Sequence, residues 1–82
     1  MRTEQDVLKD FEKLGYEIPI YNNESVEFHK FDSIGRMIVI SVFKPLKEYS
    51  KYLIMKNVMY VADIELQEHK LLNELFTIWG WI

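Results

Sequence analysis

The sequence contains no cysteine, and only three glycines, two prolines and two histidines among its 82 residues. Without cysteine there is no disulfide, no thiolate nucleophile and no cysteine-ligated zinc site. Small secreted domains with thin cores commonly depend on disulfides, so this absence indicates a reducing, cytoplasmic setting. Three glycines are too few for a glycine-rich phosphate-binding loop beside the turns that need them, and we expect no cofactor.

Long apolar runs are also missing. The longest, Met37–Phe43, is interrupted by Ser41 and is far shorter than the roughly 18 residues that a membrane-spanning helix needs. The N-terminus begins directly with a polar amphipathic pattern and shows no signal peptide. We therefore expect no contact with a membrane.

What the sequence does contain is apolar and aromatic side chains. Hydrophobic residues make up 49% of the chain and aromatic residues 15%. Disordered chains lack this apolar content, so the composition predicts an ordered core. The length is sufficient for one domain, and we assign residues 1–82 to a single unit.

The two ends of the sequence have the pattern of amphipathic helices. The spacing predicts a first helix over Glu4–Leu14, capped by Thr3 and ended by Gly15, with Tyr16 packing back on Phe11. A second helix is predicted over Gln67–Trp79. Gly80 would end it, and Trp81 would pack back in the same way.

Between the helices the apolar period falls toward two residues, which is typical of strands. Turn signals and Pro45 divide this region into three strands, Ser25–Asp32, Arg36–Phe43 and Tyr49–Met55. Val58–Asp63 is a fourth strand or an extended lead into the last helix, and Tyr16–Asn22 is a loop or an edge piece because it contains Pro19. The prediction is an α+β fold of order α-β-β-β-(β)-α, with two helices on one face of an antiparallel sheet of three to four strands.

The helix ends carry a resemblance. The segments Asp10–Tyr16 (DFEKLGY), Glu68–Leu72 (EHKLL) and Trp79–Trp81 (WGW) resemble those of small uncharacterised proteins encoded in prophages and mobile elements of Gram-positive bacteria. The resemblance implies a phage-derived gene, a bacterial cytoplasm and an accessory role. It carries no catalytic residue over to this chain.

One group of residues has the composition of a metal or acid–base site. Glu65 and His69 are four residues apart on the predicted helix, and Glu68 adjoins them. A usable metal site needs at least three convergent ligands, and a solvated helix face explains the same spacing. No nucleophile motif of the Gly-x-Ser-x-Gly kind is present. We expect no enzyme activity, and a small metal protein or enzyme is kept as an alternative.

The middle of the chain is locally basic. Residues 33–60 hold five bases and one acid, whereas the net charge of the chain is −3. Lysines interleaved with tyrosines over 36–56 could follow a phosphate backbone and stack bases, so nucleic-acid binding is an alternative function. Lysines that protect a sheet edge from other chains are the simpler explanation.

The leading hypothesis is a non-enzymatic protein-interaction module whose partner is a host or phage protein. Surface tyrosines and lysines suit such contacts, and we expect the interaction residues on the exposed sheet face, at Lys47, Tyr49, Lys51 and Tyr52. A homodimer closed by the aromatic C-terminus is a further alternative.

Overall fold

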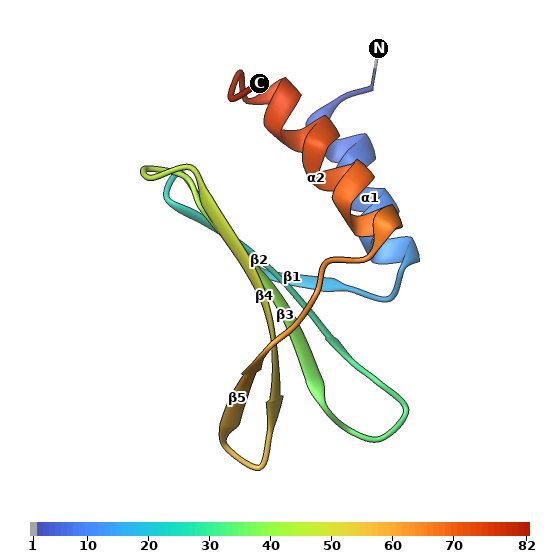
Figure 1. Ribbon diagram of the computed structural model, residues 1–82. Helices are drawn as coiled ribbons and strands as arrows, with labels where there is room; N and C mark the ends of the chain where they lie inside the picture. The colour runs from blue at the N-terminus through green and yellow to red at the C-terminus, as the bar shows by residue number, and fades with distance from the viewer. Residues whose placement is uncertain (1) are drawn as a thin grey trace.

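The computed structural model describes residues 2–82. Five strands lie in the chain between two helices (Figure 1). The elements are α1 (Glu4–Lys13), β1 (Glu17–Tyr21), β2 (Ser25–Phe31), β3 (Met37–Phe43), β4 (Glu48–Met55), β5 (Val58–Val61) and α2 (Leu66–Ile78). The α+β class and the terminal helices are as predicted.

The sheet is larger than the sequence predicted. It has five strands in the order β1-β2-β3-β4-β5, and every neighbouring pair is antiparallel. The expected three to four strands were too few because Pro19 weakened the case for β1. The proline is accommodated at the edge of the sheet, where the register shifts between Glu17 and Ile20 and no partner needs its missing N–H.

Local signals define α1 as expected. The Thr3 side chain accepts from the backbone of Asp6, and the Asp6 carboxylate accepts from the backbone of Thr3. Gly15, with φ +98°, follows the helix, and the N–H of Tyr16 bonds back to Phe11. The Tyr16 and Phe11 rings meet edge to face at 6.0 Å, so the predicted capping contact is confirmed.

The end of α2 repeats this arrangement. Gly80 has φ +79°, and the N–H of Trp81 bonds to the carbonyl of Phe76. The two rings stack with centroids 4.8 Å apart. Trp81 is thereby partly buried, whereas Ile82 is exposed. Neither helix in residues 2–82 is long and apolar enough to cross a membrane.

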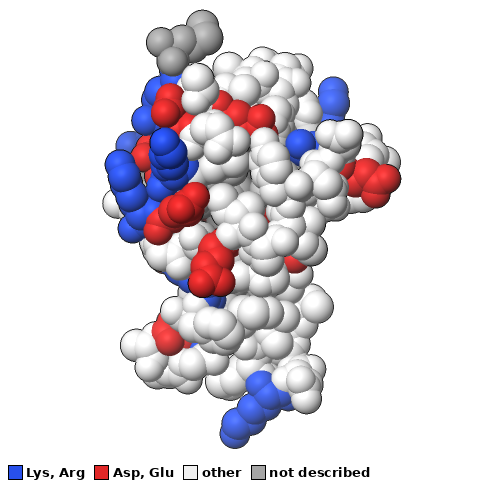
Figure 2. Space-filling model, turned by 180° about the vertical axis from the view of Figure 1, so that it is seen from behind, with Lys and Arg blue, Asp and Glu red and all other residues white. Residues whose placement is uncertain are grey.

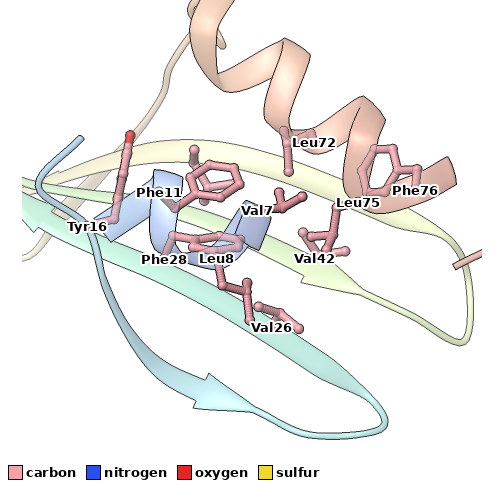
Figure 3. Packing of buried hydrophobic residues seen from close by; sticks show 11 residues of the cluster. Val7, Leu8, Phe11, Tyr16, Val26, Phe28, Val42, Leu72, Leu75 and Phe76 are labelled. Atoms are coloured by element: carbon pink, nitrogen blue, oxygen red, sulfur yellow. The ribbon is translucent and has the colours of Figure 1, made fainter. Parts of the chain in front are cut away.

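The core lies between the two helices and one face of the sheet (Figure 3). Phe11 of α1 stacks on Phe28 of β2 with ring centroids 4.0 Å apart, and Leu72 of α2 is fully buried with them. Burying apolar side chains of this size contributes roughly 1.5–3 kcal/mol each. The remaining buried members of this cluster are Val7, Leu8, Tyr16, Val26, Ile40, Val42, Leu75 and Phe76. Both helices thus cover the same face, as expected.

The helices cover only part of that face. In Figure 1 they lie over one end of the sheet, and the β2–β3 and β4–β5 turns project beyond them at the other end, which we call the distal end. Exposure follows this arrangement along β4, where Lys51 is buried, Leu53 is half-buried and Met55 is 38% exposed. The distal end of the sheet is therefore uncovered on both faces.

Candidate functional site

The structure separates the four residues predicted to form one interaction surface. Side chains alternate between faces along a strand, so Tyr49 and Lys51 lie on the helix-covered face and Tyr52 lies on the outer face of β4. Tyr49 is 42% exposed, but its ring packs 5.1 Å from that of Phe76. Lys47 is exposed in the β3–β4 turn with φ +52°.

The structure contradicts the expected exposure of Lys51. Its side chain is only 6% exposed, and Nζ donates to Oε1 of Glu68 at 2.6 Å. The expectation of an exposed Lys51 was wrong because the strand presents this residue to α2, where a buried carboxylate pairs with it. A buried, paired lysine offers no surface to a partner.

Glu68 is the centre of this buried polar cluster, which consists of Tyr16, Lys51 and Glu68. The Tyr16 hydroxyl donates to Oε2, and the backbone N–H of Glu65 donates to Oε1 at 2.9 Å. The carboxylate itself is 1% exposed. Each of its oxygens has a donor, as a buried charge requires. The cluster fastens the first turn of α2 to β4 and to Tyr16, three residues after the end of α1.

The surroundings shift the pKa values of two of these groups. Burial alone would raise the pKa of Glu68, but the hydrogen bonds from Lys51, Tyr16 and Glu65 outweigh it, so the pKa is lowered from 4.5. Burial, and next the hydrogen bond to the carboxylate, raise the pKa of the Tyr16 hydroxyl well above its usual value of 10. Glu68 is thus held charged and Tyr16 neutral, the states in which both hydrogen bonds are strongest.

The predicted metal or acid–base group is not assembled. Glu68 points into the core, whereas His69 is exposed, and Glu65 precedes the helix as its N-cap. In residues 2–82 there is no group of three or more metal-ligating side chains. The other histidine, His29, lies on the outer sheet face with Nε2 2.8 Å from Oε1 of Glu27.

The bases of segment 36–56 do not gather on one surface. Besides the buried Lys51, Arg36 pairs with Asp32 inside the β2–β3 turn at 2.6 Å. Lys44 stacks over the Trp79 ring, 4.5 Å from its centroid, and beside Tyr21 at 5.5 Å. Lys47 and Lys56 occupy two different turns. A phosphate backbone would need a continuous row of such charges.

Exposed apolar side chains concentrate at the distal end of the sheet, a surface that the sequence pattern did not predict. The distal apolar surface, as we call it, consists of Phe31, Ile34, Met55 and Val58–Val61. Phe31 is 72% exposed, Ile34 69% and Val61 95%. Figure 2 shows few charged side chains over this part, whereas they are dense over the helices.

Cross-strand register makes this surface continuous on the outer face. Phe31, Met37, Ile54 and Met59 lie opposite one another in turn across β2, β3, β4 and β5. The next row holds His29, Val39, Tyr52 and Val61. The available sequence signal was the uncharged stretch 57–62, which predicted a strand but not its exposure.

Comparisons with known proteins return no match. No family model, no curated protein and no solved structure resembles the chain closely enough to be matched.

Proposed function

We propose that this chain is a non-enzymatic protein-interaction module that binds another protein through the distal apolar surface. The observation that carries the proposal is the exposure of seven apolar residues at one end of the sheet, distributed over both faces and the β5 edge: Phe31, Ile34, Met55 and Val58–Val61. Large contiguous apolar patches on soluble proteins mark surfaces that become covered by a partner.

The chemistry of this surface favours a protein partner. Phe31 and Tyr60 supply aromatic area, and Met55 and Met59 supply flexible side chains that adapt to a partner's shape. Burying each large apolar side chain contributes roughly 1.5–3 kcal/mol. The gross gain from four such anchors is of the same order as the roughly 8 kcal/mol of a micromolar complex, and the cost of association must be subtracted from that gain.

The proposed interaction surface lies at a different end of the sheet from the residues expected from the sequence. Tyr52 remains beside it, in the row that contains Val61. Lys47 and Tyr49 lie toward the opposite end of β4, and Lys51 is buried. We extend the proposal to an accessory role in a bacterial cytoplasm, with a host or phage protein as the partner; this extension rests only on the sequence segments at the helix ends, and the comparisons add nothing to it.

Site-specific photo-crosslinking in an expressing bacterium tests the proposal. A photoreactive amino acid is placed at Phe31 or Ile34, and at the exposed Lys9 and Glu12 of α1 as matched controls. We expect one reproducible adduct from the distal positions alone. Excess purified intact protein should suppress it, whereas a Phe31→Ser/Ile34→Ser competitor should not. No adduct at the distal positions, or equal adducts from α1, would reject the proposal.

A salt-titrated mobility-shift assay tests the nucleic-acid alternative separately. Phosphate contacts would give binding that weakens steeply as salt rises.

A further inference from the structure

The two edges of the sheet differ in how they are protected. At the β1 edge, Pro19 removes a backbone donor, and the register shift between Glu17 and Ile20 distorts the strand. Both are common devices against the addition of another strand. The β5 edge has neither device: Val58–Val61 is uncharged, regular in its pairing with β4, and exposed at all four residues.

The hairpin geometry shows which backbone groups of β5 face outward. Lys56 and Asn57 form the two-residue turn, with φ of +50° and +65°, so Met55 and Val58 are a hydrogen-bonded pair. From this pair onward, hydrogen-bonded and non-hydrogen-bonded residue pairs alternate along β4 and β5. The N–H of Ala62 bonds to the carbonyl of Lys51 at 3.0 Å, in the phase this alternation requires. Met59 and Val61 therefore direct their N–H and C=O groups away from β4.

We infer that β5 pairs antiparallel with β5 of a second copy of this chain, about a twofold axis at Tyr60, to form a ten-stranded sheet. In this register the outward groups of Met59 meet those of Val61 in the other copy, and the reverse pair is identical by symmetry. The two Tyr60 residues face each other as a close, non-hydrogen-bonded pair. This inference rests on the proposed function, because it names the occupant of part of the distal apolar surface.

The charges at the two ends of β5 favour a second copy of this chain as the partner of this edge. Lys56 precedes the uncharged segment 57–62, and Asp63 follows it. The exposed strand is therefore positive at its start and negative at its end. The antiparallel register places Asn57 opposite Asp63 of the other copy and Lys56 opposite Ile64, one residue further along. The positive start of each strand thus lies beside the negative end of the other, whereas a parallel arrangement would bring like charges together.

The expected affinity is modest. A standard stable interface buries about 800 Å² per partner, which is a large share of a surface of 5608 Å². Pairing of four-residue strands together with contact between Met59 and Val61 on the outer face covers less than this. We expect a reversible dimer with a dissociation constant in the micromolar range.

Sedimentation equilibrium of the purified chain at low salt, with two charge-reversal variants, tests the inference. Lys56→Asp and Asp63→Lys should each self-associate roughly three- to tenfold more weakly at low salt, since each variant places like charges near one another at both ends of the strand pair. An equimolar mixture of the two variants should form a heterodimer at least as tight as the parent dimer, because every reversed charge then meets its opposite. Lys56 and Asp63 are both exposed, and circular dichroism checks that both variants fold.

A proline variant tests the edge itself. Val61→Pro removes an N–H that points away from β4, so the chain should stay folded and become monomeric at all concentrations. Any of three results would overturn the inference. The parent chain could be monomeric up to millimolar concentration, or the Val61→Pro variant could still dimerise. The third is a mixture of the two charge variants that self-associates no more tightly than either variant alone. The proposed function would survive any of these if photo-crosslinks at Phe31 still capture a different protein, of a mass other than twice that of the chain.

Discussion

Replacing Lys51 by methionine would leave the Glu68 carboxylate buried without its counter-charge. In the intact protein Nζ lies 2.6 Å from Oε1, and the two side chains are 6% and 1% exposed. Removing one partner of such a buried pair costs about 3–5 kcal/mol. A chain of this length has a free energy of unfolding on the order of 4–12 kcal/mol. Lys51→Met should therefore lose a large share of its stability, or unfold at 25 °C.

Removing the whole cluster should cost much less than removing its cation. The triple variant Tyr16→Phe/Lys51→Met/Glu68→Leu eliminates the buried charge and the hydroxyl that bonds to it. Replacing a buried ion pair by apolar residues of similar volume is often neutral or stabilising. We expect the triple variant to exceed Lys51→Met in unfolding free energy by at least about 2 kcal/mol.

Urea denaturation followed by tryptophan fluorescence measures these differences in unfolding free energy. The direction in which the unfolding free energy changes with pH is a second, independent test. In the intact protein the lowered pKa of Glu68 makes unfolding free energy rise with pH through the ordinary glutamate value of 4.5. Without Lys51, burial is less opposed and the pKa of Glu68 should rise, so stability should fall as the carboxylate ionises. A cost for Lys51→Met below about 1 kcal/mol, or a triple variant less stable than Lys51→Met, would refute this reasoning.

Three further outcomes are expected. Acid should destabilise the intact protein as pH falls below 4.5 toward the lowered pKa of Glu68, and the triple variant should show a shallower slope in urea titrations over that range. Gly15→Ala should lower the free energy of unfolding by about 1–2 kcal/mol, because φ of +98° is unfavourable for any residue with a Cβ. Sterics add little to this cost, since the new methyl group would contact only Cδ of Lys30 at 3.8 Å. An unchanged melting temperature would contradict this expectation. Phe28→Ala should cost about 3–5 kcal/mol, whereas Phe31→Ala, on the other face of β2, should change stability by less than about 0.5 kcal/mol; equal losses would argue against the assigned faces.

Local sequence signals are sufficient to predict both helices, the cap that starts α1 and the glycines that follow each helix. Thr3, Gly15 and Gly80 act on backbone groups within four residues of themselves, so their effects can be derived without knowing the fold. The aromatic contacts of Phe11 with Tyr16 and of Phe76 with Trp81 follow from those same turns. The strands β2, β3 and β4 also follow from local turn signals, whereas the same signals predict a loop or an edge piece at β1 and a strand or an extended lead at β5.

Packing between distant segments sets which face each residue of β4 presents and which half of the sheet stays uncovered. Both faces of β4 mix polar and apolar side chains, so its alternation does not identify the inward face. Lys51 is inward because Glu68, distant in sequence, is brought over it by α2. The exposure of Val58–Val61 likewise depends on where two short helices end above the sheet. These outcomes depend on contacts between segments far apart in the chain, which local sequence patterns do not specify.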